Sequence, residues 1–426
     1  MRIVLLLVLY GVIPGLQFIL FLLDMPFFGF LDAVNYFFSI FSYYFILNHI
    51  LITLKLPFLQ NRLPYDRMVK FHVVSGTLVI IGLYYHVLDK LLRGKLIDLL
   101  SWVILVLFTV LYTFAVLWIE APGVRRFRRA ILKRLGRKNL APYDALKMLH
   151  GYAFLLLAFF GFLHIRKAGV LDSSYTFAAV YPFIHLVLVM GMFAYSRLRK
   201  LWLPHFRLVE NKQIHDVSIL TFTSTDRKNI RYKAGQFGYL KWEVPHLSHE
   251  EHPFSFLSSP SDPQVSLGIK VLGDFTNKTA LIQAGSIARI NGGFGNFIPD
   301  YARGNVCLIG SGIGIVPIVS LIRDMARNRP EHKVLCFLAV NTREDLLLEA
   351  EIKQVAKDLP ALDLRILIYT EDAILYSTEF FKEAIANPHD YTYYLCSSMP
   401  VRTIVLKALH ELGVPRSQFH FEAFSY

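Results

Sequence analysis

The sequence HVVSGTLVIIGLYYH, residues 72–86, begins and ends with histidine, and so does HGYAFLLLAFFGFLH, residues 150–164. Fourteen residues of α-helix rise about 21 Å and complete nearly four turns, so the two histidines of each segment lie on one helical face. In a bilayer whose hydrocarbon core is about 30 Å thick, they lie at two depths. Two such helices side by side can hold two stacked haems, each between one histidine from each helix.

A histidine in an apolar helix can also act only as a hydrogen-bonding partner for a neighbouring helix. Ionisable groups at membrane depth are costly, however, and usually mark a cofactor or a charge pathway. Because four histidines share one register, we predict that His72, His86, His150 and His164 bind haem iron. Bis-histidine ligation fills both axial positions and favours electron transfer over binding of a gas at the iron.

The composition is that of a membrane protein with a soluble half. Of the 426 residues, 54% are hydrophobic, the mean hydropathy is +0.43, and the apolar residues are concentrated before residue 200. The first apolar run is too long for a signal peptide and has no small-residue cleavage site after it, so we expect it to stay attached. The predicted spans lie at about 3–23, 33–54, 68–90, 98–119, 146–165 and 174–195.

The net charge of +13 reflects membrane topology rather than nucleic-acid binding. Basic residues gather between the fourth and fifth spans, whereas the first hairpin, residues 24–32, has none. The positive-inside rule places the basic loop in the cytoplasm, where it can contact anionic lipid, and both chain termini on the same side. His72 and His150 then lie at the inner depth, and His86 and His164 at the outer. The basic residues are Arg125, Arg126, Arg128, Arg129, Lys133, Arg134, Arg137 and Lys138.

Other residues of these spans suit the surroundings of two haems. Val79 and Leu157 lie midway between the histidines on the same faces and would keep the gap between the macrocycles dry. Arg67 near the inner end, and Arg93 or Lys95 near the outer end, can pair with haem propionates. Alternatively, these cations simply extend to the membrane interface.

After about residue 205 the chain changes to a soluble pattern in two parts. Up to about 300, runs such as VSILTF, residues 217–222, are separated by turn residues, which predicts a small antiparallel barrel. From 303 onward, apolar strands alternate with helices, as in a doubly wound parallel sheet. Cys307, Cys336 and Cys396 form no zinc pattern, so we expect reduced thiols. The predicted strands of the second part lie at about 305–309, 334–340, 363–369 and 392–397.

The first strand of that sheet runs into GSGIGIVP, residues 310–317. Glycines there let the backbone approach a pyrophosphate, and the N-terminus of the next helix favours its charge. The spacing is not the G-x-G-x-x-G dinucleotide motif, and a tight strand–helix turn is the alternative. After the second strand, Arg343 occupies the place of the acidic residue that holds the ribose of NAD, which favours the 2′-phosphate of NADPH. The neighbouring Glu344 and Asp345 oppose this, and an arginine at the sheet edge is the alternative.

Two segments of the barrel suit a flavin. HPFS, residues 252–255, supplies a rigid proline, a flat aromatic ring and a hydroxyl, and NGGFG, residues 291–295, can admit a phosphate. Such segments also occur in barrels that bind no cofactor.

Together the motifs resemble the NADPH oxidase and ferric reductase superfamily, in particular its compact prokaryotic flavocytochromes, over essentially the whole chain. The resemblance implies a six-helix transmembrane haem-binding bundle at residues 1–200. It further implies a cytosolic ferredoxin-reductase-like module, with an antiparallel β-barrel FAD domain at 201–302 and an α/β doubly wound NADPH domain at 303–426. The same resemblance implies that the four histidines bind two b-type haems. It implies that FAD is bound by His252, Pro253, Phe254, Ser255, Ser258, Thr276, Gly292, Gly293, Phe294 and Gly295, and that NADPH is bound by Gly310, Gly312, Gly314 and Pro317.

Two positions depart from the family pattern. Cys396-Ser397-Ser398 stands where the family has C-G-P near the nicotinamide, and Gly293 replaces a proline of the flavin loop. Cys396 corresponds to the nicotinamide-adjacent cysteine of the family, or it is a buried structural thiol. Family members often place a carboxy-terminal aromatic residue against the flavin, and Phe424 and Tyr426 compete for that role here.

The resemblance implies hydride transfer from NADPH to FAD in the cytoplasm, and transfer of single electrons through the inner and outer haems to an acceptor outside the cell membrane. O2, reduced to superoxide, is the leading acceptor and a ferric chelate is the next. A protein partner in the periplasm or at the cell surface is an alternative of another class, and a transporter fits less well because no inverted repeat is evident. No calcium-loop pattern and no regulatory domain precedes the first span, so we expect no obligatory cytosolic activator.

Overall fold

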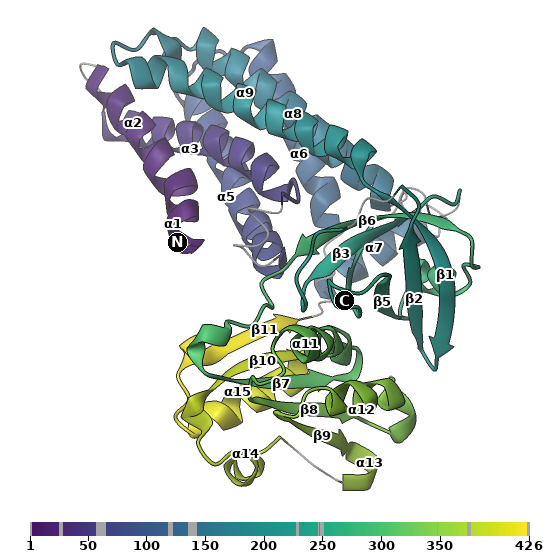
Figure 1. Cartoon of the computed structure of the whole chain (residues 1–426). Helices are drawn as coiled ribbons and strands as arrows, with labels where there is room; N and C mark the ends of the chain where they lie inside the picture. Colours follow the sequence, from purple (N-terminus) through teal and green to yellow (C-terminus); the bar gives the residue numbers. More distant parts are fainter. Residues whose placement is uncertain are drawn as a thin grey trace. The chain divides into compact units, whose positions relative to one another are not determined.

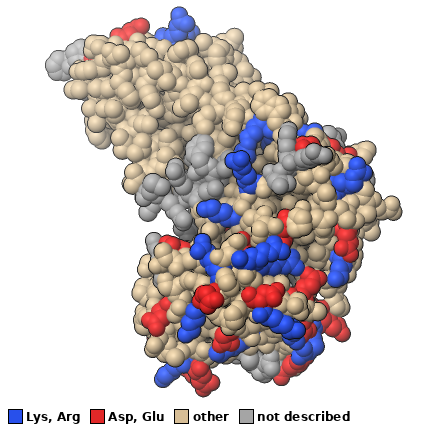
Figure 2. Space-filling view, in the orientation of Figure 1, with Lys and Arg blue, Asp and Glu red and all other residues tan. Residues whose placement is uncertain are grey.

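The chain divides into two compact units, Met1–Trp202 and Leu203–Tyr426. The computed structural model describes residues 2–24, 29–56, 65–117, 122–134, 143–226, 230–245, 247, 251–346, 348–372 and 376–423. The first unit is helical and the second contains two sheets (Figure 1). On the face shown in Figure 2, charged side chains are sparse over the first unit and frequent, with both signs mixed, over the second.

The first unit has the predicted helical bundle. Among the described residues, six helices are long and apolar enough to cross a membrane, at Val4–Asp24, Phe30–Thr53, Met68–Leu92, Leu99–Leu117, Met148–Lys167 and Thr176–Trp202. The first span runs from α1 (Arg2–Leu7) through a π-helical turn (Val8–Val12) into α2 (Ile13–Asp24). The others are formed by α3 (Phe30–Thr53), α5 (Tyr65–Leu92), α6 (Leu99–Leu117), α8 (Tyr143–Lys167) and α9 (Thr176–Arg199), and the basic segment after α6 forms a helix of its own, α7 (Pro122–Arg134).

Helix α3 lies at the centre of this bundle, in contact with α2, α5, α8 and α9. Val79 on α5 and Leu157 on α8 are buried in the same core, as expected for residues midway between the histidines. A glycine lets α3 and α5 approach closely, because a Cβ atom at Gly82 would lie 2.9 Å from the Ser42 Oγ and 3.2 Å from the Phe38 ring.

The second unit begins with the predicted antiparallel barrel. Its six strands have the order β4-β3-β6-β1-β2-β5. Phe256, one residue beyond β4, forms an isolated antiparallel bridge with Leu267 of β5, which brings the two edges of the sheet together. The elements are β1 (His205–Ile214), β2 (Val217–Ser224), β3 (Phe237–Trp242), β4 (His252–Ser255), β5 (Val265–Lys270), α10 (Asp274–Ala280) and β6 (Ile287–Phe294).

A five-stranded parallel sheet follows, in the order β11-β10-β7-β8-β9, with helices on both faces. Alternate residues of β7 serve the two faces: Val306 and Leu308 pack with α11, whereas Cys307 and Ile309 pack with α14 and α15. The elements are β7 (Asn305–Ser311), α11 (Ile315–Asn328), β8 (Val334–Val340), α12 (Glu349–Lys357), β9 (Leu362–Ile368), α13 (Tyr369–Asp372), α14 (Thr378–Ala384), β10 (Tyr391–Ser397), α15 (Met399–Glu411) and β11 (Phe419–Ala423).

Candidate cofactor sites

The four span histidines form two facing pairs. The ring centroids of His72 and His150 are 6.1 Å apart, and those of His86 and His164 are 6.2 Å apart. Because the first histidine of α5 meets the first of α8, and the second meets the second, the two helices run in the same direction. Metal–imidazole bonds of about 2 Å on both sides of one iron separate the ring centres by about 6 Å. Each pair therefore has the spacing of a bis-histidine haem site.

The nitrogens of these rings support the same assignment. The Nε2 atom of His86 and the Nδ1 atom of His72 are buried and have no hydrogen-bond partner among the described residues. Such orphaned atoms are rare in folded proteins. Each pair thus contains a ring nitrogen that the described part of the protein leaves unsatisfied, as a ligand atom would be.

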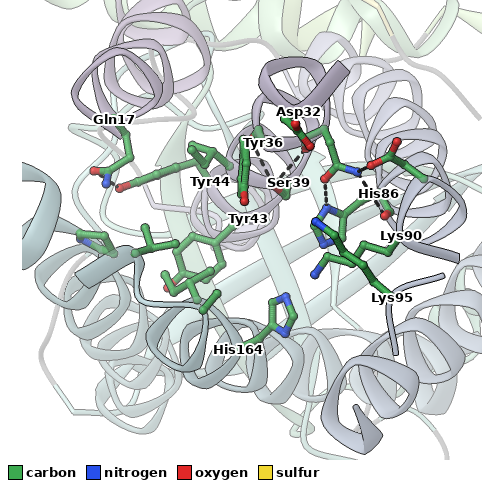
Figure 3. A pocket seen from close by; sticks show the side chains of 17 residues that line it. Gln17, Asp32, Tyr36, Ser39, Tyr43, Tyr44, His86, Lys90, Lys95 and His164 are labelled. Atoms are coloured by element: carbon green, nitrogen blue, oxygen red, sulfur yellow. Dashed lines mark hydrogen bonds between the residues drawn. The ribbon is translucent and has the colours of Figure 1, made fainter. Parts of the chain in front are cut away.

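The outer pair borders a cavity of about 130 Å³. In Figure 3, His86 and His164 project into it, and Lys90 and Lys95 lie near His86. Lys95 is one of the cations predicted to pair with a haem propionate, and Lys90 lines the same cavity. Arg93 is instead engaged by carboxylates, because its Nε donates to Asp89 Oδ1 at 2.8 Å and its Nη1 lies 2.5 Å from Asp32 Oδ1.

A fifth histidine lies beside the inner pair. The ring of His49, on α3, is 4.8 Å from the ring of His72, and its two nitrogens lie 2.7 Å from Ser75 Oγ and 2.5 Å from the Phe45 carbonyl oxygen. Both nitrogens are thus satisfied by protein, so His49 packs against a ligand candidate without competing for a metal. The side chain of Arg67, predicted at this depth, lies outside the described residues.

In the second unit, a cavity of about 380 Å³ brings the barrel and the glycine-rich loop together. It contains the predicted segment of β4, the predicted Thr276, Ile313 from the glycine-rich loop and Val316 from the first turn of α11. The hydroxyl oxygen of Ser255 is buried without a partner among the described residues, which suits a polar cofactor edge. The lining residues are His252, Pro253, Phe254, Ser255, Gly268, Lys270, Leu272, Gly273, Asp274, Phe275, Thr276, Ile313 and Val316.

Local contacts fix the walls of this cavity. The His252 ring stacks on Phe275, with centroids 4.0 Å apart. The Thr276 hydroxyl oxygen accepts hydrogen bonds from the backbone N–H groups of Leu272 and Gly273, both at 2.9 Å, and so closes the turn before α10. A flat ring could lie between these walls, with apolar contact on its faces.

The structure does not bring Ser258 and Phe294 to this cavity. The Ser258 hydroxyl is buried, 2.8 Å from the Tyr232 hydroxyl, and accepts the backbone N–H of Ser266 at 2.9 Å. Phe294 is fully buried against Phe237 in the barrel core. In the positions they occupy, both residues support the walls of the barrel rather than the cavity surface.

The glycine run around Phe294 also lies elsewhere. Gly292 lies against Phe256, and Gln236 donates from Nε2 to the carbonyl oxygens of Gly293, at 3.2 Å, and Gly295, at 2.9 Å. Gly295 has a φ of +96°, and a Cβ atom there would lie 2.5 Å from a carboxylate oxygen of Glu422. The run therefore joins the barrel to the last strand, where only glycine fits.

The predicted nucleotide loop connects β7 to α11. Gly310 ends the buried part of β7, Gly312 has a φ of +56°, and Pro317 lies in the first turn of α11. A Cβ atom at Gly314 would lie 2.0 Å from the Cys396 carbonyl oxygen, so glycine is required where the loop meets the end of β10. The loop and Cys396 are thus brought together at the carboxyl edge of the sheet, where doubly wound folds bind ligands.

Cys396 and Glu422 lie side by side on β10 and β11. Cys396 is fully buried, and burial raises the pKa of its thiol well above its usual value, with a smaller contribution from Glu422. Burial also raises the pKa of the Glu422 carboxyl to about 8. Both groups are therefore held neutral at pH 7. Phe424 and Tyr426, the predicted aromatic residues at the flavin, lie outside the described residues.

Arg343 is half-exposed and held by carboxylates. Its Nε and Nη2 donate to the two carboxylate oxygens of Glu371 at 3.0 and 2.7 Å, and its Nη1 donates to Glu349 at 3.5 Å. A 2′-phosphate would have to compete with Glu371 for this guanidinium. The structure thus favours the alternative of an arginine at the sheet edge more than the sequence does.

Polar residues of the spans that contact the histidines are not identified by the sequence analysis. Asn35 Oδ1 lies 2.5 Å from His86 Nδ1, and Ser101 Oγ lies 3.2 Å from His164 Nδ1. The available signal is their polarity within apolar helices, where an amide or hydroxyl needs a partner. Their partners lie more than fifty residues away in sequence, so spacing alone could not identify them.

Comparisons with known proteins agree with this arrangement. Residues 208–289 match the family model of an FAD-binding domain, and residues 308–398 match that of an oxidoreductase NAD-binding domain. The chain is 30% identical over 196 residues to a superoxide-generating NADPH oxidase heavy chain of Dictyostelium discoideum, covering 40% of this chain and 26% of that protein.

Two further relatives show the same pattern. The chain is 26% identical over 250 residues to the putative respiratory burst oxidase homolog protein G of Arabidopsis thaliana, covering 53% of this chain and 28% of that protein. It is 27% identical over 210 residues to the flavohemoprotein of Bacillus subtilis, covering 45% and 51%. The matches thus span about half or less of each relative. With an FAD-binding domain, an oxidoreductase NAD-binding domain and, among the described residues, six apolar helices, the chain is similar to NADPH oxidases and resembles the NADPH oxidase and ferric reductase superfamily.

Proposed function

We propose that this protein transfers electrons across a cell membrane, from cytosolic NADPH by way of FAD and two b-type haems to O2 on the outer side. The O2 is reduced to superoxide, which is released there. The observation that carries the proposal is the pair of facing histidine rings at each of two depths, on helices that can span a membrane. A flavin would accept a hydride and release single electrons, and each haem would carry one electron at a time.

The residues of the chain would bind and separate these groups. His72 with His150, and His86 with His164, would hold one iron each, and the buried Val79 would help keep the space between them dry. In the second unit, the cavity that includes Ser255 and Thr276 would hold the flavin. The Gly314 loop would hold the dinucleotide against Cys396, whose neutral thiol excludes water without adding charge.

The orientation belongs to the same proposal. The described part of the basic segment, α7, carries Arg125, Arg126, Arg129 and Lys133 on its surface, which supports a cytoplasmic location for the α6–α8 connection. His72 and His150 would then be the inner pair, and the second unit would lie in the cytoplasm, where NADPH is available. Cysteines introduced at the ends of α3 and α9, and labelled from outside in intact cells, test this orientation.

The decisive experiment is an assay of purified full-length protein in detergent with FAD, NADPH and air. We expect two haems per chain, NADPH-dependent O2 consumption, and cytochrome c reduction that superoxide dismutase abolishes. No cytosolic protein is added, so activity under these conditions also tests the expectation that no activator is obligatory. A protein that binds no haem, or that oxidises NADPH without consuming O2, would contradict the proposal.

A ferric chelate is the second candidate acceptor. Lys90 and Lys95 line the outer cavity, and cations attract the anionic complexes in which ferric iron is soluble. In the same assay under argon, ferric citrate would then oxidise NADPH, at a rate that falls as ionic strength rises. If ferric citrate does not change the rate of NADPH oxidation under argon, O2 remains the acceptor.

A further inference from the structure

The two histidine pairs differ in what holds their Nδ1 atoms. In the outer pair, His86 Nδ1 lies 2.5 Å from Asn35 Oδ1, and His164 Nδ1 lies 3.2 Å from Ser101 Oγ. In the inner pair, His72 Nδ1 is buried and lacks any partner among the described residues. The outer pair is therefore supported by polar groups of neighbouring helices in a way that His72 is not.

The contacts of Asn35 determine which nitrogen of His86 carries its proton. Asn35 Nδ2 donates to Asp89 Oδ2 at 2.5 Å and to the His86 carbonyl oxygen at 3.3 Å, so the NH₂ end of the amide is committed to acceptors. The oxygen end then faces His86, and its partner Nδ1 must be the donor. The remaining lone pair is on Nε2, which is the buried atom without a partner among the residues described.

This arrangement is rigid because it is part of a longer chain of interactions. Asn35 is only 5% exposed. Asp89 accepts from Arg93 Nε at 2.8 Å, and Arg93 also pairs with Asp32, three residues before Asn35 on α3. The amide is thus fixed from both α3 and α5, at the wall of the cavity shown in Figure 3.

We propose that Asn35 is a positioning residue for the outer haem. By accepting the Nδ1 proton of His86, it holds the ring with Nε2 toward the iron and increases electron donation from Nε2, which stabilises ferric iron and lowers the midpoint potential of that haem. A lower potential favours release of the electron to an acceptor such as O2. This inference rests on the proposed function, because it requires a haem between His86 and His164.

The test compares the full-length parent with Asn35→Leu, which keeps the approximate size of the side chain and removes the acceptor. Haem absorbance is titrated against electrode potential without NADPH or O2, and CO is then added to the reduced protein. We expect one of the two haem components to move to higher potential, with about a tenfold change in its ferric-to-ferrous ratio at fixed potential, which is about 59 mV for a one-electron couple. If His86 leaves the iron altogether, the haem content falls toward one per chain, as expected for His86→Ala, and any outer haem that stays bound binds CO. Either result also supports the proposal.

Ser39→Ala is the matched control. Ser39 lines the same cavity but donates only to the backbone carbonyls of Asn35 and Tyr36, at 3.1 Å each, so both potentials and the lack of CO binding should be retained. If Asn35→Leu yields no folded protein, Asn35→Ala removes the same acceptor with less volume and is measured in the same way.

Two results would count against different claims. A parent protein with fewer than two haems per chain contradicts the proposed function itself. A parent with two haems and an Asn35 variant with unchanged potentials and no CO binding overturns only the role of Asn35.

Discussion

Each histidine of the two pairs should be individually necessary for one haem. Replacing His72 or His150 by alanine is expected to lower the haem content from about two to about one per chain through loss of the inner haem, and His86→Ala or His164→Ala through loss of the outer one, because one ligand alone holds the macrocycle poorly. The pyridine haemochrome assay measures the content. His185→Ala, at a buried histidine on α9 outside both pairs, is the control and should keep both haems.

The nucleotide preference should depend on Arg343 and on the carboxylate that holds it. If Arg343 binds the 2′-phosphate, Arg343→Ala lowers the preference for NADPH over NADH about ten- to a hundredfold. This factor corresponds to the binding free energy of one charge-assisted hydrogen bond. Glu371→Gln weakens the competing pair and should raise that preference. The measurement is kcat/KM for both nucleotides. An equal loss for NADPH and NADH would show that Arg343 supports the fold instead.

Glu422 should make the stability of the second unit depend on pH. Its pKa is raised by burial from 4.5 to about 8, so between these values the native state binds more protons than the unfolded chain, and stability falls as pH rises. In the parent, the free energy of unfolding should fall by an amount on the order of 1–3 kcal/mol between pH 5 and pH 8, and in Glu422→Gln this fall should be absent. Urea unfolding of the full chain, followed by flavin fluorescence, measures this. Glu383→Gln, at an exposed carboxylate of α14, should leave the parent's pH dependence intact.

Residues with a spacing or a motif are the ones that the sequence can predict. The four histidines pair as their register requires, and residues 252–255 with Thr276 line one cavity. Phe294 and Ser258 lie away from that cavity, and their role at a flavin stays a prediction, because a motif does not say which face of a strand a side chain occupies. Asn35 could not be predicted, since its contact with His86 depends on how α3 packs against α5.

At the scale of the elements, the close contact of α3 and α5 should govern the outer haem site. Gly82→Leu would force a side chain against Phe38 and Ser42, and overpacking of this kind typically costs about 1–3 kcal/mol. We expect a lower melting temperature in detergent and partial loss of the outer haem. Gly191→Leu is the control, because a Cβ atom at Gly191 on α9 meets no heavy atom within 4 Å. Equal melting temperatures for both variants would contradict this view of the helix contact.

The long, strongly patterned elements are predictable. The first five spans and the strands at Asn305–Ser311, Val334–Val340, Leu362–Ile368 and Tyr391–Ser397 agree with the predicted segments to within a few residues, since buried strands and spans are marked by continuous apolar runs. The sixth span begins as predicted but ends seven residues later, at Trp202. The helix α7 is predicted only as a basic loop, because its charges obscure an amphipathic repeat that a membrane surface or a protein contact would stabilise.

At the scale of the whole molecule, the fold places every thiol out of reach. The chain has three cysteines, and Cys307, Cys336 and Cys396 are all fully buried in the parallel sheet, with the pKa of each thiol raised by burial. N-ethylmaleimide should therefore label none of them in the native protein and all three in urea. Rapid labelling of the native protein, at any one of them, would contradict the burial.

This burial bears on the endurance of a protein proposed to release superoxide. Peroxide and superoxide attack thiolates that they can reach, and their products accumulate as sulfinic and sulfonic acids that cells do not generally repair. A catalyst whose thiols are neutral and enclosed does not consume itself by this route. Its working lifetime would then be limited by loss of cofactor, by unfolding of the bundle or by oxidation of exposed methionines such as Met148, and not by oxidation of its cysteines.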